Sequence, residues 1–405
     1  MNNNPNQSIS DGMSASAPQF EALGSSTPYK LLAAYVDKHY EIRYNTMTGL
    51  PECRRKGKET DVFKVMDERT LNTLLMDAQE YGVECGMKEL RCLLCSQRIP
   101  DFHPMKSYMD SLPQWDGVDR VTPMAYRISH DLLWVRCFHI WQLSCAAQWM
   151  GIPQEAANSL MPILVSTEQG LGKSTFCRKL LPPELRGYYA DKLSLNEGSH
   201  VEERLSQLAI INLDELDRLT DKQMATLKNL IQAQTCSFRR LYTNHLVQMP
   251  RMASFIATSN SHQLLSDPSG SRRFVCIDVE GEIDRSPVNY PQYYAQLKAE
   301  VLRGERTWLT HDEEHELAAH NQSFYRYAPE MDVFHRCFIV PSDADPAFGD
   351  DILEASASDI YQYMCQRFPR PMKGSSPIKM GNVLTMLGVK RIHRRNGNFY
   401  QVKYA

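Results

Sequence analysis

Two glycines, a lysine and two hydroxyl residues lie close together near the middle of the chain, as Gly170, Gly172, Lys173, Ser174 and Thr175. Because glycine has no Cβ, the backbone N–H groups beside it can approach an anion closely. A lysine at this position can reach the β- and γ-phosphates of a nucleotide, and the adjacent serine hydroxyl can ligate Mg²⁺. These residues predict a phosphate-binding loop that holds ATP and Mg²⁺, with Thr175 as a further contact.

The surroundings of this loop support the prediction, with one departure. The apolar segment 161–165 is predicted to be a short strand, and a helix is expected after the loop, as phosphate loops require. The common pattern G-x-x-x-x-G-K-[ST] would place a glycine where this sequence has Thr167. Because Gly170 and Gly172 remain, we expect the cradle to form; a plain turn between strand and helix is the alternative.

A second apolar run, residues 207–213, ends in Asp214 and Glu215, about forty residues after the loop. Asp214 is the expected Mg²⁺ ligand, and Glu215 is the expected general base that polarises the attacking water. Asp217 could support either residue. Because apolar runs that end in Asp-Glu are common, this assignment depends on the spacing from the lysine loop.

A third strand is predicted at 253–260 and ends in Asn260, which would orient water beside the γ-phosphate. An asparagine in an ordinary turn is the alternative. Arg272 and Arg273 follow a glycine-containing turn, and either can supply an arginine finger that neutralises charge on the γ-phosphate. A surface ion pair is the alternative for these arginines.

The elements that must position these residues form an α/β core with flanking domains, because apolar strands alternate with helices from Met161 to about Val279. A polar, small-residue start predicts a disordered tail, and the last residues predict a small basic module. The predicted divisions are a tail at 1–28, an α-rich domain at 29–128, a P-loop ATPase domain at 129–330, a linker at 331–354 and a winged-helix-like module at 355–405.

Composition excludes several classes of protein. The formal net charge of -3 excludes a polycation that coats nucleic acid along its whole length. Eleven scattered cysteines are typical of reduced thiols in a cytoplasmic protein rather than of a disulfide scaffold. The start of the chain does not resemble a signal peptide, and no long apolar run predicts a membrane partner.

The order of the motifs resembles superfamily III helicases, a branch of the AAA+ ATPases, and is most similar to the virulence-associated E (VirE) family. The similar blocks are SLPQWDGVDR (111–120), QGLGKSTF (169–176), INLDELD (211–217), FRRLY (238–242), ASFIATSN (253–260) and DPSGSRRF (267–274). The resemblance implies an AAA+-type sheet in which the Asn260 strand lies between the loop strand and the Asp214 strand. It also implies a ring, usually a hexamer, in which Arg272 or Arg273 reaches a neighbour's site; we favour Arg272.

Two segments are candidates for DNA contact. Residues 236–249 predict a β-hairpin, and the resemblance implies that Arg239, Arg240 or His245 grips DNA in a central pore. A solvated hairpin without a ligand is the alternative. At the C-terminus, two helices and a hairpin that turns at Asn396-Gly397 suggest a winged helix.

The winged-helix-like module is basic. From residue 370 onward it has eight Lys or Arg residues and no Asp or Glu. Arg394 and Arg395, beside the turn of the hairpin, are the candidates for phosphate contact, and a solubilising charged face is the alternative.

The first functional hypothesis is therefore an ATP-driven, ring-forming DNA helicase, translocase or replication-initiation ATPase of a mobile element or prophage. Its DNA partner would be single-stranded or forked. A second hypothesis is a nucleotide-dependent assembly switch with slow hydrolysis, for which Thr167 is the best support. A third is a helicase subunit that works with a separate primase.

Overall fold

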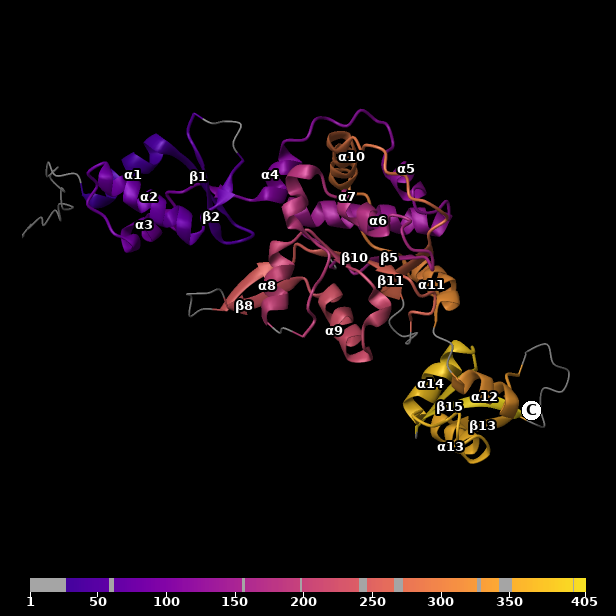
Figure 1. Ribbon diagram of the computed structural model, residues 1–405. Helices are drawn as coiled ribbons and strands as arrows, with labels where there is room; N and C mark the ends of the chain where they lie inside the picture. Colours follow the sequence, from indigo (N-terminus) through magenta and orange to yellow (C-terminus); the bar gives the residue numbers. More distant parts are fainter. Residues whose placement is uncertain are drawn as a thin grey trace, which may run out of the picture. The chain divides into compact units, whose positions relative to one another are not determined.

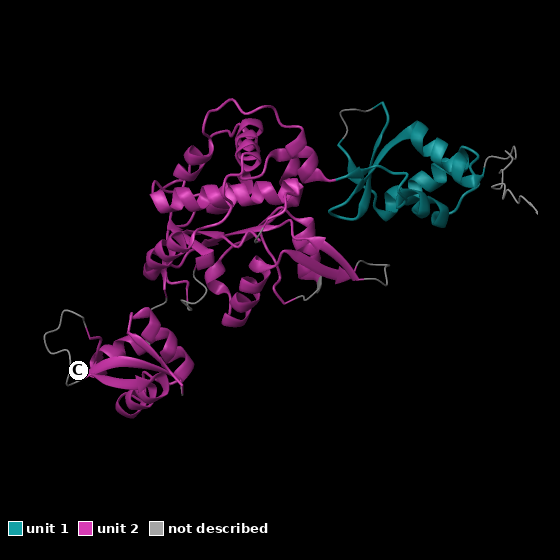
Figure 2. Ribbon diagram, turned by 180° about the vertical axis from the view of Figure 1, so that it is seen from behind, with its two compact units in different colours: residues 1–102 teal, residues 103–405 magenta. Residues whose placement is uncertain are grey.

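The computed structural model describes most of the chain, and contacts divide it into a unit that ends at residue 102 and a unit that spans 103–405 (Figure 2). The described residues are 27–57, 62–154, 157–196, 199–239, 246–265, 272–325, 329–341, 352–395 and 397–405. The predicted tail, apart from its last two residues, lies outside these ranges. Among the described residues, no helix has both the length and the apolar character that crossing a membrane requires.

The first unit combines three helices with a four-stranded sheet in the order β3-β2-β1-β4. Its core forms where apolar side chains of the helices, such as Leu32, Leu74 and Leu90, are buried together. The prediction of an α-rich domain therefore omits most of the sheet, because only one of its strands has a clear alternating pattern. The elements are α1 (Pro28–His39), β1 (Tyr40–Asn45), β2 (Leu50–Arg55), β3 (Lys64–Val65), α2 (Glu68–Glu80), α3 (Met87–Leu94) and β4 (Asp101–Phe102).

The division between the units falls after residue 102, whereas the sequence predicts a boundary near residue 128. The reason is that the loop before residue 121 is bonded to a helix far along the chain. The backbone N–H of Asp116 donates to Gln292 Oε1 at 3.0 Å, and that of Arg120 donates to Gln296 Oε1 at 2.7 Å. The helices involved are α4 (Pro104–Asp110), α5 (Val121–Tyr126), α6 (Leu132–Met150) and α10 (Tyr290–Leu302).

A five-stranded parallel sheet forms the centre of the second unit, in the order β11-β5-β10-β7-β6 (Figure 1). Strands β5, β7 and β10 are buried along their whole length, which explains their continuous apolar runs. Strand β10 lies between β5 and β7, in agreement with the order that the resemblance implies. The strands are β5 (Met161–Val165), β6 (Tyr189–Ala190), β7 (Ile210–Leu213), β10 (Ser254–Ser259) and β11 (Phe274–Asp278).

Helices cover both faces of this sheet: α6 and α7 lie on one side, and α8 and α9 on the other (Figures 1 and 2). A two-stranded hairpin, β8–β9, follows α9. Its base is fixed by the buried Arg251, whose Nη2 donates to Asn158 O at 2.9 Å. The elements are α7 (Lys173–Lys179), α8 (Ser199–Gln207), α9 (Asp221–Gln232), β8 (Thr235–Arg239), β9 (Leu246–Pro250) and α11 (His311–His320), with 3-10 helices at Pro183–Tyr188, Leu216–Arg218 and Asn321–Phe324.

The C-terminal module has three helices and a small antiparallel sheet in which β15 pairs with three other strands. The prediction of a linker at 331–354 is wrong for its first part, because Val333, Phe334 and Phe338 belong to the core of this module. Residues 342–351 lie outside the described ranges. The elements are α12 (Pro329–Cys337), β12 (Phe338–Ile339), β13 (Leu353–Ser356), α13 (Ala357–Arg367), α14 (Pro377–Met386), β14 (Arg391–Arg394) and β15 (Gly397–Tyr404).

Candidate functional site

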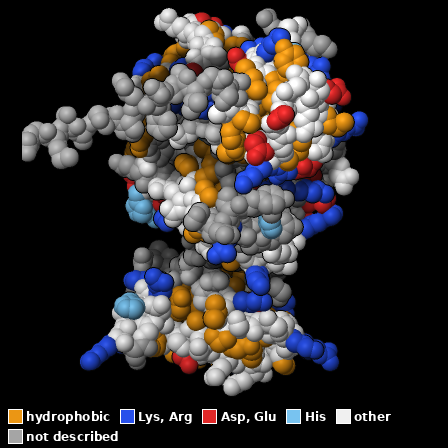
Figure 3. All heavy atoms as spheres, turned by 90° about the vertical axis from the view of Figure 1, so that its left-hand side faces the viewer, with side chains coloured by type: hydrophobic (Ala, Val, Ile, Leu, Met, Phe, Trp, Pro, Cys, Tyr) orange, Lys and Arg blue, Asp and Glu red, His pale blue; other side chains and the backbone are white. Residues whose placement is uncertain are grey.

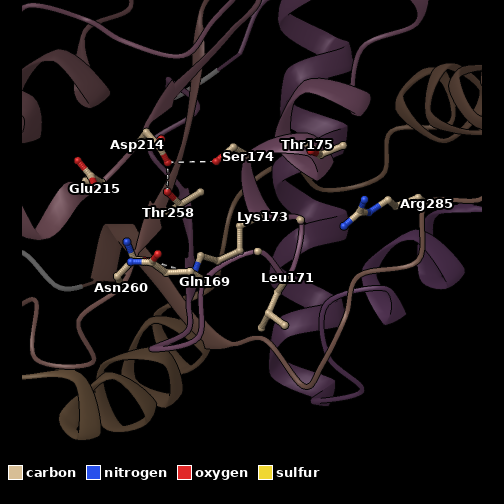
Figure 4. Close-up of a pocket in the computed structure, with 12 residues that line it drawn as sticks. Gln169, Leu171, Lys173, Ser174, Thr175, Asp214, Glu215, Thr258, Asn260 and Arg285 are labelled. Atoms are coloured by element: carbon tan, nitrogen blue, oxygen red, sulfur yellow. Dashed lines mark hydrogen bonds between the residues drawn. The ribbon is translucent and has the colours of Figure 1, made fainter.

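A pocket of about 320 Å³ lies where strands β5, β7 and β10 end (Figure 4). Carboxyl ends of adjacent parallel strands meet at one edge of a sheet, so residues that are distant in sequence are brought together there. The pocket is lined by residues 169–175, Asp214, Glu215, Thr258, Asn260 and Arg285. Eight predicted site residues, from the loop and helix after β5 and from the ends of β7 and β10, thus surround one cavity: Gly170, Gly172, Lys173, Ser174, Thr175, Asp214, Glu215 and Asn260.

The loop after β5 uses glycine where its backbone requires it. Gly170 has φ 84° and Gly172 has φ 98°, values at which a side chain would strain the backbone. Thr167 has no such φ, because among the described residues only glycines and Glu215 have positive φ. The missing third glycine therefore does not prevent this loop conformation.

Lys173 is the buried cation of the pocket. Its ammonium donates to the carbonyl oxygens of Ser166 at 3.0 Å and Glu168 at 3.4 Å, and to Asn260 Oδ1 at 3.1 Å. Burial lowers the pKa of Lys173, and the carboxylates of Asp214 and Asp217 act in the opposite direction. The three bonded oxygens belong to neutral groups, so the lysine presents a positive charge to an anion in the pocket.

Asp214 is bonded to two hydroxyl groups of the pocket. Its Oδ1 accepts from Ser174 Oγ at 3.2 Å and from the hydroxyl of Thr258. Mg²⁺ prefers oxygen ligands and often takes only one or two from the protein, with water and phosphate completing its shell. Ser174 and Asp214 meet this requirement, although the described residues include no group of three or more His, Cys, Asp or Glu that could hold a metal.

Glu215 and Asp217 differ in position although they are close in sequence. Glu215 lines the pocket, and its backbone φ of 57° is a strained value of the kind that occurs at functional sites. Its carboxylate pairs with Arg218 at 2.7 Å. Asp217 instead accepts from Ser259 Oγ at 3.0 Å and from the backbone N–H of Asn260 at 3.4 Å. Asp217 thus supports the end of β10, a role that differs from the support of Asp214 or Glu215 that the sequence suggested.

Arg272 and Arg273 lie away from this pocket. They precede β11, which runs parallel to β5 with Phe274 opposite Met161, so they lie near the amino ends of the strands. Arg272 pairs with Glu314 at 3.2 Å, and both arginines line a second pocket of about 230 Å³. The structure therefore does not bring them together with Lys173 of the same chain.

The candidates for DNA contact are only partly described. Arg239 is exposed at the end of β8, while Arg240 and His245 lie outside the described residues. In the C-terminal module, Arg394 pairs with Glu354 and Arg395 is exposed. Figure 3 shows Lys and Arg side chains on the visible face of this module, at the bottom of the view.

Two pocket residues outside the loop were not predicted from the sequence. Thr258 lies on β10 two positions before Asn260, which directly follows this strand, so the period of two residues along a strand could have indicated it. Arg285 comes from the segment after β11 and has no motif around it. Only the fold brings it to the loop.

The fold and the pocket define a mixed α/β protein with a central parallel sheet and a polar site at its carboxyl edge. The virulence-associated protein E-like domain matches residues 109–326, which is more than half of the chain, and the chain belongs to this family. A domain of unknown function, described from a B. theta gene, matches residues 327–402.

No curated protein matches the chain. Among solved structures, the apo structure of the NrS-1 C terminal region (305-718) is similar, with a TM-score of 0.48 and 11% identity. The superposition covers 94% of the present chain and 100% of the NrS-1 chain. The A form apo structure of the same region has a TM-score of 0.45 and 11% identity, and the superposition covers 93% of the present chain and 99% of the NrS-1 chain.

Proposed function

We propose that this chain is a Mg²⁺-dependent ATPase of the AAA+ superfamily III type, which acts on DNA in the replication of a mobile element or prophage. The observation that carries the ATPase proposal is the common pocket of Lys173, Ser174, Asp214, Glu215 and Asn260, residues separated by up to 87 positions. Their arrangement over three adjacent parallel strands supports this assignment beyond the loop motif alone.

The roles follow from the contacts of each residue. Lys173 would bind the outer phosphates, since the oxygens that accept hydrogen bonds from its ammonium are neutral and leave its positive charge for an anion. Ser174 and Asp214 would hold Mg²⁺, which when bound neutralises phosphate charge and orients the leaving group. Glu215 would accept the proton of the attacking water, and Asn260 would orient that water.

The position of the two arginines supports an assembly of several copies. A strand of five residues spans about 16 Å, which separates Arg272 and Arg273 from the pocket of their own chain. An arginine finger from this edge would therefore act on the pocket of a neighbouring copy, as in a ring, with a hexamer as the expected form.

DNA is the proposed partner because two exposed elements present basic residues. The β8–β9 hairpin carries Arg239, and the C-terminal module, which we propose to be a winged helix, carries Arg394 and Arg395. Contacts of this kind bind phosphates and give affinity without sequence choice.

The test is ATP hydrolysis with and without single-stranded DNA, in the wild type, in Lys173→Ala and in the control Lys222→Ala, whose exposed lysine lies on α9. We expect DNA-stimulated hydrolysis that Lys173→Ala abolishes and Lys222→Ala retains. Slow hydrolysis that DNA does not change would contradict the motor and favour the assembly switch. Unwinding that requires an added primase would favour the helicase subunit of a two-protein system.

A further inference from the structure

The segment after β11 is fixed against the phosphate loop. The backbone N–H of Val279 donates to Val165 O at 2.9 Å, and that of Ile283 donates to Leu171 O at 3.0 Å. At its end, Lys179 Nζ donates to Arg285 O at 2.9 Å. The backbone of Arg285 is therefore held by the helix that follows the loop, so the side chain starts from a defined position.

The guanidinium of Arg285 lies beside the loop itself. A Cβ added to Gly172 would be 3.5 Å from Arg285 Nε and 3.7 Å from Nη2. Figure 4 shows this side chain directed toward the loop from the side of Thr175, whereas Asp214, Glu215 and Asn260 lie on the other side. The pocket thus has a carboxylate and amide end and a separate arginine end.

The guanidinium of Arg285 is held only weakly by other side chains, although its backbone is fixed. Its described ion pair is with Glu282 at 3.4 Å, and the two side chains are 53% and 76% exposed. Pairs with this exposure contribute little and exchange readily with other partners. The guanidinium is thus available to an anion in the pocket, and its planar donors suit a phosphate.

We propose that Arg285 is a nucleotide-binding residue that acts within its own chain and contacts the phosphate nearest the nucleoside. This inference rests on the proposed function, in which the Asp214, Glu215 and Asn260 end holds the reacting γ-phosphate. The opposite end of the pocket then faces the α-phosphate, which ATP and ADP share. Arg285 consequently contributes to the binding of both nucleotides and little to the rate of hydrolysis at saturation.

The experiment measures the affinity of the full chain for ADP and for a non-hydrolysable ATP analogue by calorimetry. We expect Arg285→Ala to weaken the binding of both nucleotides about tenfold or more, because it removes a charge-assisted hydrogen bond. Arg285→Lys should lose less affinity, because it keeps the positive charge. Two controls should retain wild-type affinity: Arg303→Ala, an exposed arginine outside the pocket, and Glu282→Gln, which removes only the ion pair.

The outcomes separate this inference from the proposed function. Unchanged affinity in Arg285→Ala, or a loss for the ATP analogue alone, would overturn the α-phosphate contact. If the wild type bound both nucleotides but did not hydrolyse ATP, the ATPase proposal would fail while the Arg285 comparison remained decisive. A wild type that bound neither nucleotide would overturn both. If the alanine variant does not fold, Arg285→Gln repeats the test with a longer side chain that lacks the positive charge.

Discussion

The position of Arg272 at the amino edge of the sheet gives a quantitative prediction for mixed assemblies. If Arg272 acts on the pocket of a neighbouring copy, a working site needs Lys173 in one copy and Arg272 in the next. Arg272→Ala and Lys173→Ala should each be inactive alone. In an equal mixture, a copy with intact Lys173 occurs at half of the positions, and its neighbour has intact Arg272 in half of those cases. The mixture should therefore recover roughly one quarter of the wild-type rate, whatever the size of the ring.

The assay is steady-state ATP hydrolysis after the two variants are mixed and allowed to exchange, with exchange followed by fluorescence transfer between labelled copies. A mixture of Lys173→Ala with the exposed-lysine variant Lys222→Ala gives the control for simple dilution of active copies. Full exchange without recovered hydrolysis would refute the reasoning for Arg272. The same mixture made with Arg273→Ala distinguishes the two arginines.

Two further predictions concern residues that do not line the pocket. Asp217→Ala should lower the hydrolysis rate at saturating ATP about tenfold with little change in nucleotide affinity, because Asp217 holds the backbone of Asn260; equal losses in rate and affinity would contradict this role. Hydrogen bonds from Arg306 hold the pKa of Glu313 at about 2, below the ordinary 4.5. Between these pH values the folded state therefore binds fewer protons than the unfolded state. The ionised Glu313 carboxylate stabilises the fold above pH 4.5, and this stabilisation is lost as the pH falls toward 2. In urea unfolding over this range, Glu313→Gln should flatten the pH dependence, and an unchanged dependence would exclude the mechanism.

The sequence predicted the carboxyl edge of the sheet well because its signals are local. Each strand is a short apolar run with a polar residue directly after it, so Lys173, Asp214 and Asn260 could be placed without knowing the full fold. Parallel pairing then brings the strand ends together. The same local reasoning located α13 and α14 of the C-terminal module but missed α12, most of which falls in the predicted linker.

Features that depend on long-range contacts were not predictable. Arg285 lies in the pocket because backbone hydrogen bonds join Val279 to β5 and Ile283 to the loop, more than a hundred positions earlier. The boundary near residue 128 failed for the same reason, since the bonds from Asp116 and Arg120 to α10 span 176 positions. In the SLPQWDGVDR block, Trp115 Nε1 donates to Val118 O at 2.9 Å, so this tryptophan closes its own loop.

The two edges of the sheet also limit the symmetry that the proposed assembly can have. The pocket lies at the carboxyl edge, and Arg272 lies near the amino edge of the same sheet. When one patch of a protein binds a different patch on the next copy, the contact is heterologous, and repetition either closes into a ring or continues as a filament. An isologous two-fold dimer would bring like patches together instead. If Arg272 acts on a neighbouring pocket within a ring, the rotation between copies closes the assembly, and variants that change this rotation should form filaments rather than two-fold dimers.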